Sequence, residues 1–94
     1  MRVRYTKEAV AQLAMIAEYT AALYGKRVAR TLGSQLRLLI EQEIPVFPQR
    51  GREGVVPGTR ELVVRRPPCR IVYRLADDQI EILVVLHQAQ EWTR

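Results

Sequence analysis

The side chains in this sequence that could perform chemistry are one histidine, one cysteine and a series of arginines in the second half of the chain. His87 ends an apolar run and could act as a general acid or base. Arg70 and Arg74 could stabilise a developing negative charge, and Glu61 is a second choice for the base. A single histidine at the end of a strand is more often a surface residue that forms a hydrogen bond, so both interpretations stay open.

Positive charge is concentrated in the stretch from position 50 to position 74. Seven arginines against two glutamates give this stretch +5, which equals the net charge of the whole chain. These residues are Arg50, Arg52, Arg60, Arg65, Arg66, Arg70 and Arg74, with Glu53 and Glu61. The planar guanidinium group of arginine can bind a phosphate or a carboxylate through two hydrogen bonds. The stretch is therefore either a solvated basic surface or a platform for nucleic acid or an acidic protein partner.

Length and composition exclude several classes of protein. The chain has 94 residues, of which 48% are hydrophobic, and this suits one small domain over residues 1–94. It has no apolar run long enough to span a membrane, and its N-terminus lacks the apolar core of a signal peptide. Cys69 is the only cysteine, so neither an internal disulfide nor a thiolate metal site is expected. We expect a cytoplasmic protein with no metal, no cofactor and no membrane contact.

The first half of the chain is predicted to form a strand and two helices. Alternation of arginines with apolar residues predicts a strand over residues 2–6. Apolar residues at steps of three and four predict helices over residues 7–24 and 26–44. Thr6 can cap the first helix, and Gly25 can end it. Because the connection between the helices is so short, they are expected to form an antiparallel hairpin.

The second half is predicted to form a sheet. Pro45 is expected to end the second helix, in which Gly33 is expected to permit close contact between helices. Residues 45–59 contain three prolines and three glycines, which predicts a loop. Strands are predicted over residues 60–66, 70–76 and 79–87, with turns at Pro67-Pro68 and Asp77-Asp78 and a short tail, 88–94. The fold class is therefore α+β, an N-terminal strand and a helix hairpin packed on a three- to four-stranded, mainly antiparallel sheet.

Alternation along the strands predicts which side chains face the helices. The aliphatic face of the last strand is expected to lie on them: Ile80, Ile82, Val84 and Leu86. The opposite face would carry Glu81, Leu83, Val85 and His87. In the middle strand, Ile71, Tyr73 and Leu75 are expected to be core. Arg70, Arg74 and His87 would then share an open, basic face with aliphatic neighbours, and such a face usually accepts a partner.

Three segments of the sequence are similar to segments of one protein superfamily. They are FPQRGREGVVPGTREL (residues 47–62), CRIVYRL (residues 69–75) and ILVVLHQAQEW (residues 82–92). Together with the order of one strand, two helices and three strands, they resemble the RelE/ParE superfamily of toxins from type II toxin–antitoxin systems. The resemblance covers nearly the whole chain, and it implies the same α+β fold.

The superfamily contains two kinds of toxin, and the resemblance favours one of them. RelE-like members cleave mRNA at the ribosome, whereas ParE-like members act against DNA gyrase and block replication. Segments 58–62 and 87–92 are similar to ParE-like sequences. RelE-like nucleases tend to have more basic residues on the sheet and a basic or tyrosine residue just after it, where this chain has Gln88, Ala89 and Gln90. The resemblance implies a ParE-like gyrase inhibitor that is not an enzyme. The alternative is a RelE-like mRNA endonuclease using His87, Arg70 and Arg74.

The resemblance also implies partners. A cognate antitoxin would neutralise the toxin through an acidic, amphipathic C-terminal segment and form a hetero-oligomer with it. DNA gyrase would be the target, or alternatively the ribosome with its mRNA. Systems of this kind are associated with plasmid stabilisation and bacterial stress responses. Trp92 is expected to pack over the sheet edge or, if exposed, to contact a partner. The residues expected to bind the target or the antitoxin are Arg60, Glu61, Arg65, Arg70, Arg74, Leu83, Val85, His87 and Trp92.

Overall fold

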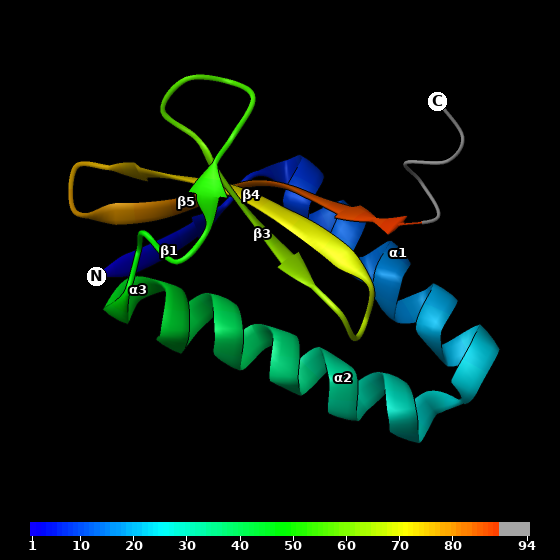
Figure 1. Ribbon diagram of the computed structural model, residues 1–94. Coiled ribbons are helices and arrows are strands. Elements are labelled where there is room, and N and C mark those ends of the chain that lie inside the picture. Colours follow the sequence, from blue (N-terminus) through cyan, green and yellow to red (C-terminus); the bar gives the residue numbers. More distant parts are fainter. Residues whose placement is uncertain (89–94) are drawn as a thin grey trace.

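The computed structural model describes residues 1–88, which form one sheet and a helix hairpin (Figure 1). The strands are β1 (Arg2–Tyr5), β2 (Arg52–Glu53), β3 (Arg60–Val64), β4 (Cys69–Ala76) and β5 (Gln79–His87). The helices are α1 (Lys7–Tyr24), α2 (Lys26–Leu38), the π-helical turn η1 (Leu39–Glu43) and α3 (Ile44–Val46). Among the described residues, no helix is both long enough and apolar enough to cross a membrane.

The five strands form a single sheet in the order β1-β5-β4-β3-β2. Strand β1 pairs with β5 in parallel, and the other neighbours are antiparallel. The predicted α+β class is confirmed. The sheet has one strand more than expected, because β2 lies inside the predicted loop and pairs only with Arg60 and Glu61. A strand of two residues between glycines leaves no alternation by which the sequence could reveal it.

The helix hairpin starts and turns where the sequence signals predict. The Thr6 hydroxyl accepts a hydrogen bond from the backbone N–H of Ala9 at 3.0 Å and so caps α1. Gly25 separates α1 from α2 and has a φ of 92°, a backbone conformation that glycine adopts readily. The expectation that Pro45 ends the second helix is wrong, since helical structure continues to Val46.

A widened turn explains how the helix passes Pro45. In a regular α-helix the proline ring would meet the carbonyl group four residues earlier. Here the turn before it is a π-helix, in which the backbone N–H of Ile44 bonds to the carbonyl of Leu39. This wider turn shifts the preceding carbonyl groups, and it is the ordinary kind of irregularity that lets a helix accommodate such a residue.

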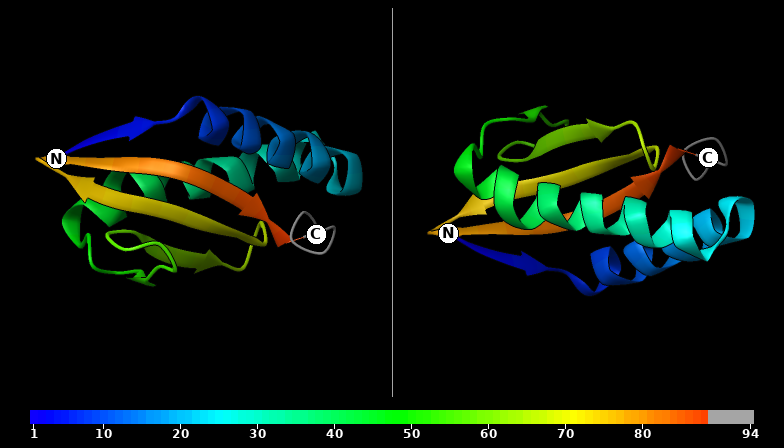
Figure 2. Two further views of the ribbon diagram at one scale, coloured as in Figure 1. Left: turned by 90° about the horizontal axis from the view of Figure 1, so that it is seen from above. Right: turned by 90° about the horizontal axis from the view of Figure 1, so that it is seen from below.

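The two long helices contact the sheet in different ways (Figure 2). Helix α2 crosses one face of the sheet, whereas α1 continues from β1 along the edge of β5. There the Thr6 hydroxyl donates to the Leu83 carbonyl at 2.6 Å, and the Gln12 side-chain oxygen accepts from the backbone N–H of Val85 at 2.7 Å. The side chains of Thr6, which caps α1, and of Gln12 therefore satisfy the backbone of β5 beyond the point where β1 ends. The buried core joins Ala9, Ile16, Leu36, Ile40 and Ile44 to Cys69, Ile71, Tyr73, Ile80, Ile82 and Val85.

Strand β5 contains an irregularity that changes its faces. Val72 pairs with Val84, but the next residue, Tyr73, pairs with Ile82, so Leu83 is an extra residue on β5. A bulge of this kind reverses the direction of every later side chain. The predicted faces are therefore right for Ile80 and Ile82 and wrong for the four positions after the bulge: Val84, Val85, Leu86 and His87. Val85 and His87 face the helix layer and are 0% and 8% exposed, respectively.

The hydrogen bond from Val85 to Gln12 gives a test of how α1 closes the sheet edge. Substitution Gln12→Ala leaves the half-buried N–H of Val85 without its acceptor, so it should lower the free energy of unfolding by about 1–3 kcal/mol. Substitution Gln35→Ala, at an exposed position of α2, changes helix propensity equally and serves as the control. Urea denaturation measures both, and equal losses for the two variants would contradict this account of the edge.

Candidate functional site

The open face of the sheet carries two arginines, and each is paired with a carboxylate. Arg70 on β4 binds Glu61 on β3, with 3.0 Å between Nη1 and Oε1. Arg74 binds Glu81 on β5, with 2.7 Å between Nε and Oε1. The Arg70 pair is the less accessible, since its side chains are 25% and 10% exposed. The positive charge predicted for this face is therefore largely compensated within the protein.

Arg60 and Tyr73 reach from the sheet to the chain before β2. The Arg60 guanidinium donates to the carbonyl of Gly51. The Tyr73 hydroxyl donates to the Pro48 carbonyl at 2.8 Å and accepts from the backbone N–H of Gly51 at 3.0 Å. A Cβ atom on Gly51 would lie 2.8 Å from the carbonyl oxygen of Glu61, so the segment can approach β3 this closely only with glycine here. Arg60, a predicted binding residue, holds this segment on the sheet.

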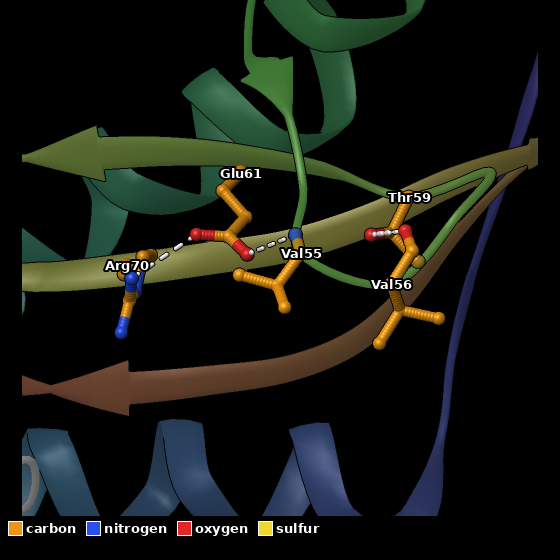
Figure 3. Close-up of polar contacts among 5 residues, drawn as sticks. All are labelled: Val55, Val56, Thr59, Glu61 and Arg70. Carbon is orange, nitrogen blue, oxygen red and sulfur yellow. Dashed lines mark hydrogen bonds and ion pairs between the residues drawn. The ribbon is translucent and has the colours of Figure 1, made fainter.

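Glu61 joins the open face to the loop between β2 and β3 (Figure 3). One carboxylate oxygen binds Arg70, and the other accepts a hydrogen bond from the backbone N–H of Val55 at 3.2 Å. The Thr59 hydroxyl closes the loop by donating to the Val56 carbonyl at 2.6 Å. The segment 58–62, which is similar to ParE-like sequences, therefore supplies two residues that hold this loop, Thr59 and Glu61. The contact between Glu61 and Val55 could not be predicted from the sequence, because it joins a strand side chain to a loop backbone.

His87 lies on the helix side of the sheet, away from Arg70 and Arg74. Its ring centroid is 4.8 Å from that of Tyr19 on α1, and the planes form an angle of 69°. The prediction that His87 shares the open face with the two arginines is wrong, because the bulge at Leu83 turns it over. The three groups nominated for RNA cleavage are thus not assembled in one place.

The remaining predicted binding residues are scattered. Val85 is fully buried in the core, so its predicted exposure on the open face is also wrong. Leu83 is half-buried at the bulge. Arg65 is exposed in the turn after β3 and lines, with His87 and Tyr19, a hollow of about 460 Å³. Trp92 lies outside the described residues, so its expected packing stays a prediction.

A groove between α1 and α2 is a second concave surface of the described part of the chain. Its volume is about 310 Å³. It is lined mainly by apolar side chains, among them Val10, Leu13, Ile16, Ala17, Ala29, Leu32, Leu36 and Ile40. Gly33 also lines it, and a Cβ there would have no heavy atom within 4 Å. The expectation that Gly33 permits close contact between the two helices is therefore wrong.

The polar end of this groove is formed by Tyr5, Arg37 and Glu41. The Tyr5 hydroxyl donates to Glu41 at 2.7 Å. Burial and then this hydrogen bond raise the pKa of Tyr5 above its ordinary value, so the phenol stays neutral. The groove thus combines an apolar floor with one charged end.

Cys69, at the start of β4, is a buried free cysteine. Burial raises the pKa of the Cys69 thiol to about 11, so it is protonated and a poor nucleophile at neutral pH. Within residues 1–88, no group of three or more histidine, cysteine, aspartate or glutamate side chains could hold a metal ion.

Comparison with known proteins defines the class of this protein. Residues 3–92 match the family described as "ParE toxin of type II toxin-antitoxin system, parDE". The chain belongs to this family of toxins, within the RelE/ParE superfamily. The protein Y4kP of Sinorhizobium fredii is 35% identical over an aligned length of 94. The alignment covers 97% of this chain and 92% of that protein.

Solved structures give the same fold. A chain of the chromosomal ParDE toxin–antitoxin system from P. aeruginosa is 26% identical, with a TM-score of 0.74, and the match covers 93% of this chain and 95% of that one. A chain of the E. coli RelBE toxin–antitoxin complex is 16% identical, with a TM-score of 0.59, over 92% of this chain and 94% of that one. The second likeness is one of fold alone.

The Tyr73 hydroxyl provides a test of how the loop region is attached to the sheet. Substitution Tyr73→Phe leaves a backbone carbonyl at Pro48 and a backbone N–H at Gly51 unpaired. It should lower the free energy of unfolding by about 1–3 kcal/mol in urea denaturation. The control is Tyr24→Phe, which removes the hydroxyl of a side chain that is 65% exposed. A Tyr73→Phe variant as stable as the control would show that these bonds contribute little.

Proposed function

We propose that this toxin inhibits DNA gyrase by binding it, without catalysis, and that a cognate antitoxin neutralises the toxin. The observation that carries the first part is the separation of the groups that RNA cleavage would need. Arg70 and Arg74 are paired with Glu61 and Glu81 on one face of the sheet, and His87 lies on the other face. The family match and the similarity to a ParDE toxin support the same conclusion.

The chemistry of RNA cleavage explains why this separation matters. A general base must lie within hydrogen-bond reach of the ribose hydroxyl, and cations must point at the phosphate where charge develops. On the open face, a phosphate would have to displace a carboxylate from each arginine. His87 is 8% exposed behind the sheet and cannot reach the same phosphate. For this chain to act as a RelE-like nuclease, β5 would have to lose the bulge at Leu83, so that His87 turns to the face that carries Arg70 and Arg74.

The groove between α1 and α2 is the surface that we assign to the antitoxin. An amphipathic helix presents its apolar residues to a groove of this kind, and the small side chains at Ala17, Ala29 and Gly33 allow close approach. Arg37 at one end suits an acidic residue of the partner. The structural neighbours from P. aeruginosa and E. coli come from toxin–antitoxin systems, which supports a hetero-oligomer with an antitoxin.

Two assays distinguish inhibition of DNA gyrase from cleavage of mRNA. The purified chain should inhibit supercoiling by DNA gyrase and leave mRNA intact on translating ribosomes. Substitution His87→Gln should leave the inhibition unchanged, because the ring is buried against Tyr19 and away from the open face. Cleaved mRNA together with normal supercoiling would overturn the proposal, as would the loss of toxicity in a folded His87→Gln protein.

Position 33 tests the antitoxin site. Substitution Gly33→Leu fills the groove and should abolish binding of the co-encoded antitoxin in calorimetry. Substitution Gly33→Ala is the control, since it leaves most of the groove open and should keep the complex. Both changes improve helix propensity, by up to about 1 kcal/mol, so both proteins should be at least as stable as the natural one. Antitoxin that still binds Gly33→Leu with natural affinity would place its site elsewhere.

A further inference from the structure

The loop between β2 and β3 presents two valines to solvent. It extends beyond the end of β2, on the side of the sheet away from the helices (Figure 1). Val55 is 90% exposed, the highest value for a large hydrophobic residue in the described part of the chain, and Val56 is 63% exposed. Single exposed apolar side chains are common and need no explanation. The way in which this loop is built does need one.

Hydrogen bonds fix the backbone on both sides of the two valines. The Gly54 N–H donates to the Thr59 carbonyl at 2.8 Å, and the Thr59 N–H donates to the Val56 carbonyl at 3.1 Å. The Thr59 hydroxyl donates to the same Val56 carbonyl, and Glu61 accepts from the Val55 N–H (Figure 3). The bond between Gly54 and Thr59 thus holds the base of the loop, the bonds from Thr59 to Val56 hold its turn, and the bond from Val55 to Glu61 ties it to the sheet.

Two glycines make this conformation possible. A Cβ on Gly54 would lie 2.2 Å from the Thr59 hydroxyl, so any other residue there would displace the threonine that closes the loop. Gly58 has a φ of 84°, which most other residues adopt only with strain. Several residues therefore specify the shape of a loop whose most prominent side chains are in water. A preordered loop loses little conformational entropy when it binds, so this construction favours affinity for a partner.

We propose that this valine loop, residues 54–59, is the contact through which the toxin engages its protein target, by inserting Val55 into an apolar pocket. The inference rests on the proposed function, in which the target is DNA gyrase. The tip is convex, so its partner must be concave. The loop belongs to the stretch from 50 to 74, whose seven arginines still outnumber its own two glutamates and the outside partners Glu43 and Glu81 by three, so the rim of the pocket is expected to be acidic.

Topology separates this contact from the antitoxin site. Strands β1 and β2 lie at opposite edges of the sheet, with α1 beyond the β1 edge and the valine loop at the β2 edge. The groove between α1 and α2 is concave and accepts a helix, whereas the loop is convex and enters a pocket. Residues 54–59 include no arginine, lysine or aromatic side chain, so the loop lacks the groups that hold phosphates or stack on bases.

Substitution Val55→Ser tests the proposal, with Val46→Ser as the matched control. Val46 is also a valine in solvent, 84% exposed, but it lies on α3. Each variant is assayed for inhibition of gyrase supercoiling, for growth arrest on expression, for melting temperature and for antitoxin binding. Val55→Ser should weaken inhibition by at least about tenfold, because burial of a valine side chain is lost. Melting temperature and antitoxin binding should stay unchanged, and Val46→Ser should behave as the natural protein does.

The outcomes separate this inference from the proposed function. Undiminished inhibition by Val55→Ser, or an equal loss in Val46→Ser, would overturn the role of the loop and leave gyrase as the target. If the natural chain does not inhibit gyrase, the proposed target is wrong. Growth arrest then tests the loop by itself, and arrest that survives Val55→Ser overturns it. The role of the loop would also be overturned if the toxin alone bound duplex DNA and Val55→Ser abolished this binding. Val55 would then insert between base pairs and not into a protein pocket. A natural chain that neither inhibits gyrase nor arrests growth would overturn both proposals.

Discussion

Closing the edge of β5 is the constraint on which the arrangement of this molecule depends. Strand β1 pairs with β5 only as far as Tyr5, and the rest of that edge must find other hydrogen-bond partners. Thr6 supplies one and also starts α1, because its hydroxyl donates to the carbonyl of Leu83 and accepts from the N–H of Ala9. The bulge residue and the first turn of the helix are therefore fixed by the same side chain, and the direction of α1 follows from it.

The bulge then determines which chemistry the sheet can support. A strand of strict alternation would carry His87 to the open face, beside Arg70 and Arg74. The extra residue at Leu83 instead sends it against Tyr19, and Val85 enters the core. What remains on the open face is a pair of salt bridges, one of which positions a loop. A fold shared with RelE-like chains thus carries here the histidine and the two arginines on opposite faces of the sheet.

Local signals in the sequence were sufficient for the elements but not for the register. Thr6, Gly25 and the Asp77-Asp78 turn each have a chemical reason to sit where they do, and Asp77 indeed adopts a φ of 55°. The bulge left no such signal, because the residues from Leu83 to Leu86 are all aliphatic and either register buries apolar side chains. The roles of Arg60 and Glu61 were also beyond prediction. Each of them bonds to backbone groups that only the folded chain between α3 and β3 brings near.

Glu61 has a consequence for how the surfaces of the molecule communicate. Its two oxygens serve different parts of the structure, since one binds the Arg70 guanidinium and the other the backbone of the valine loop. A ligand that alters the Arg70 pair must change the electrostatic environment of the acceptor that orders the loop. Any coupling between a ligand of the open face and a partner of the loop would act equally in both directions. One carboxylate thereby connects the sheet face to the loop.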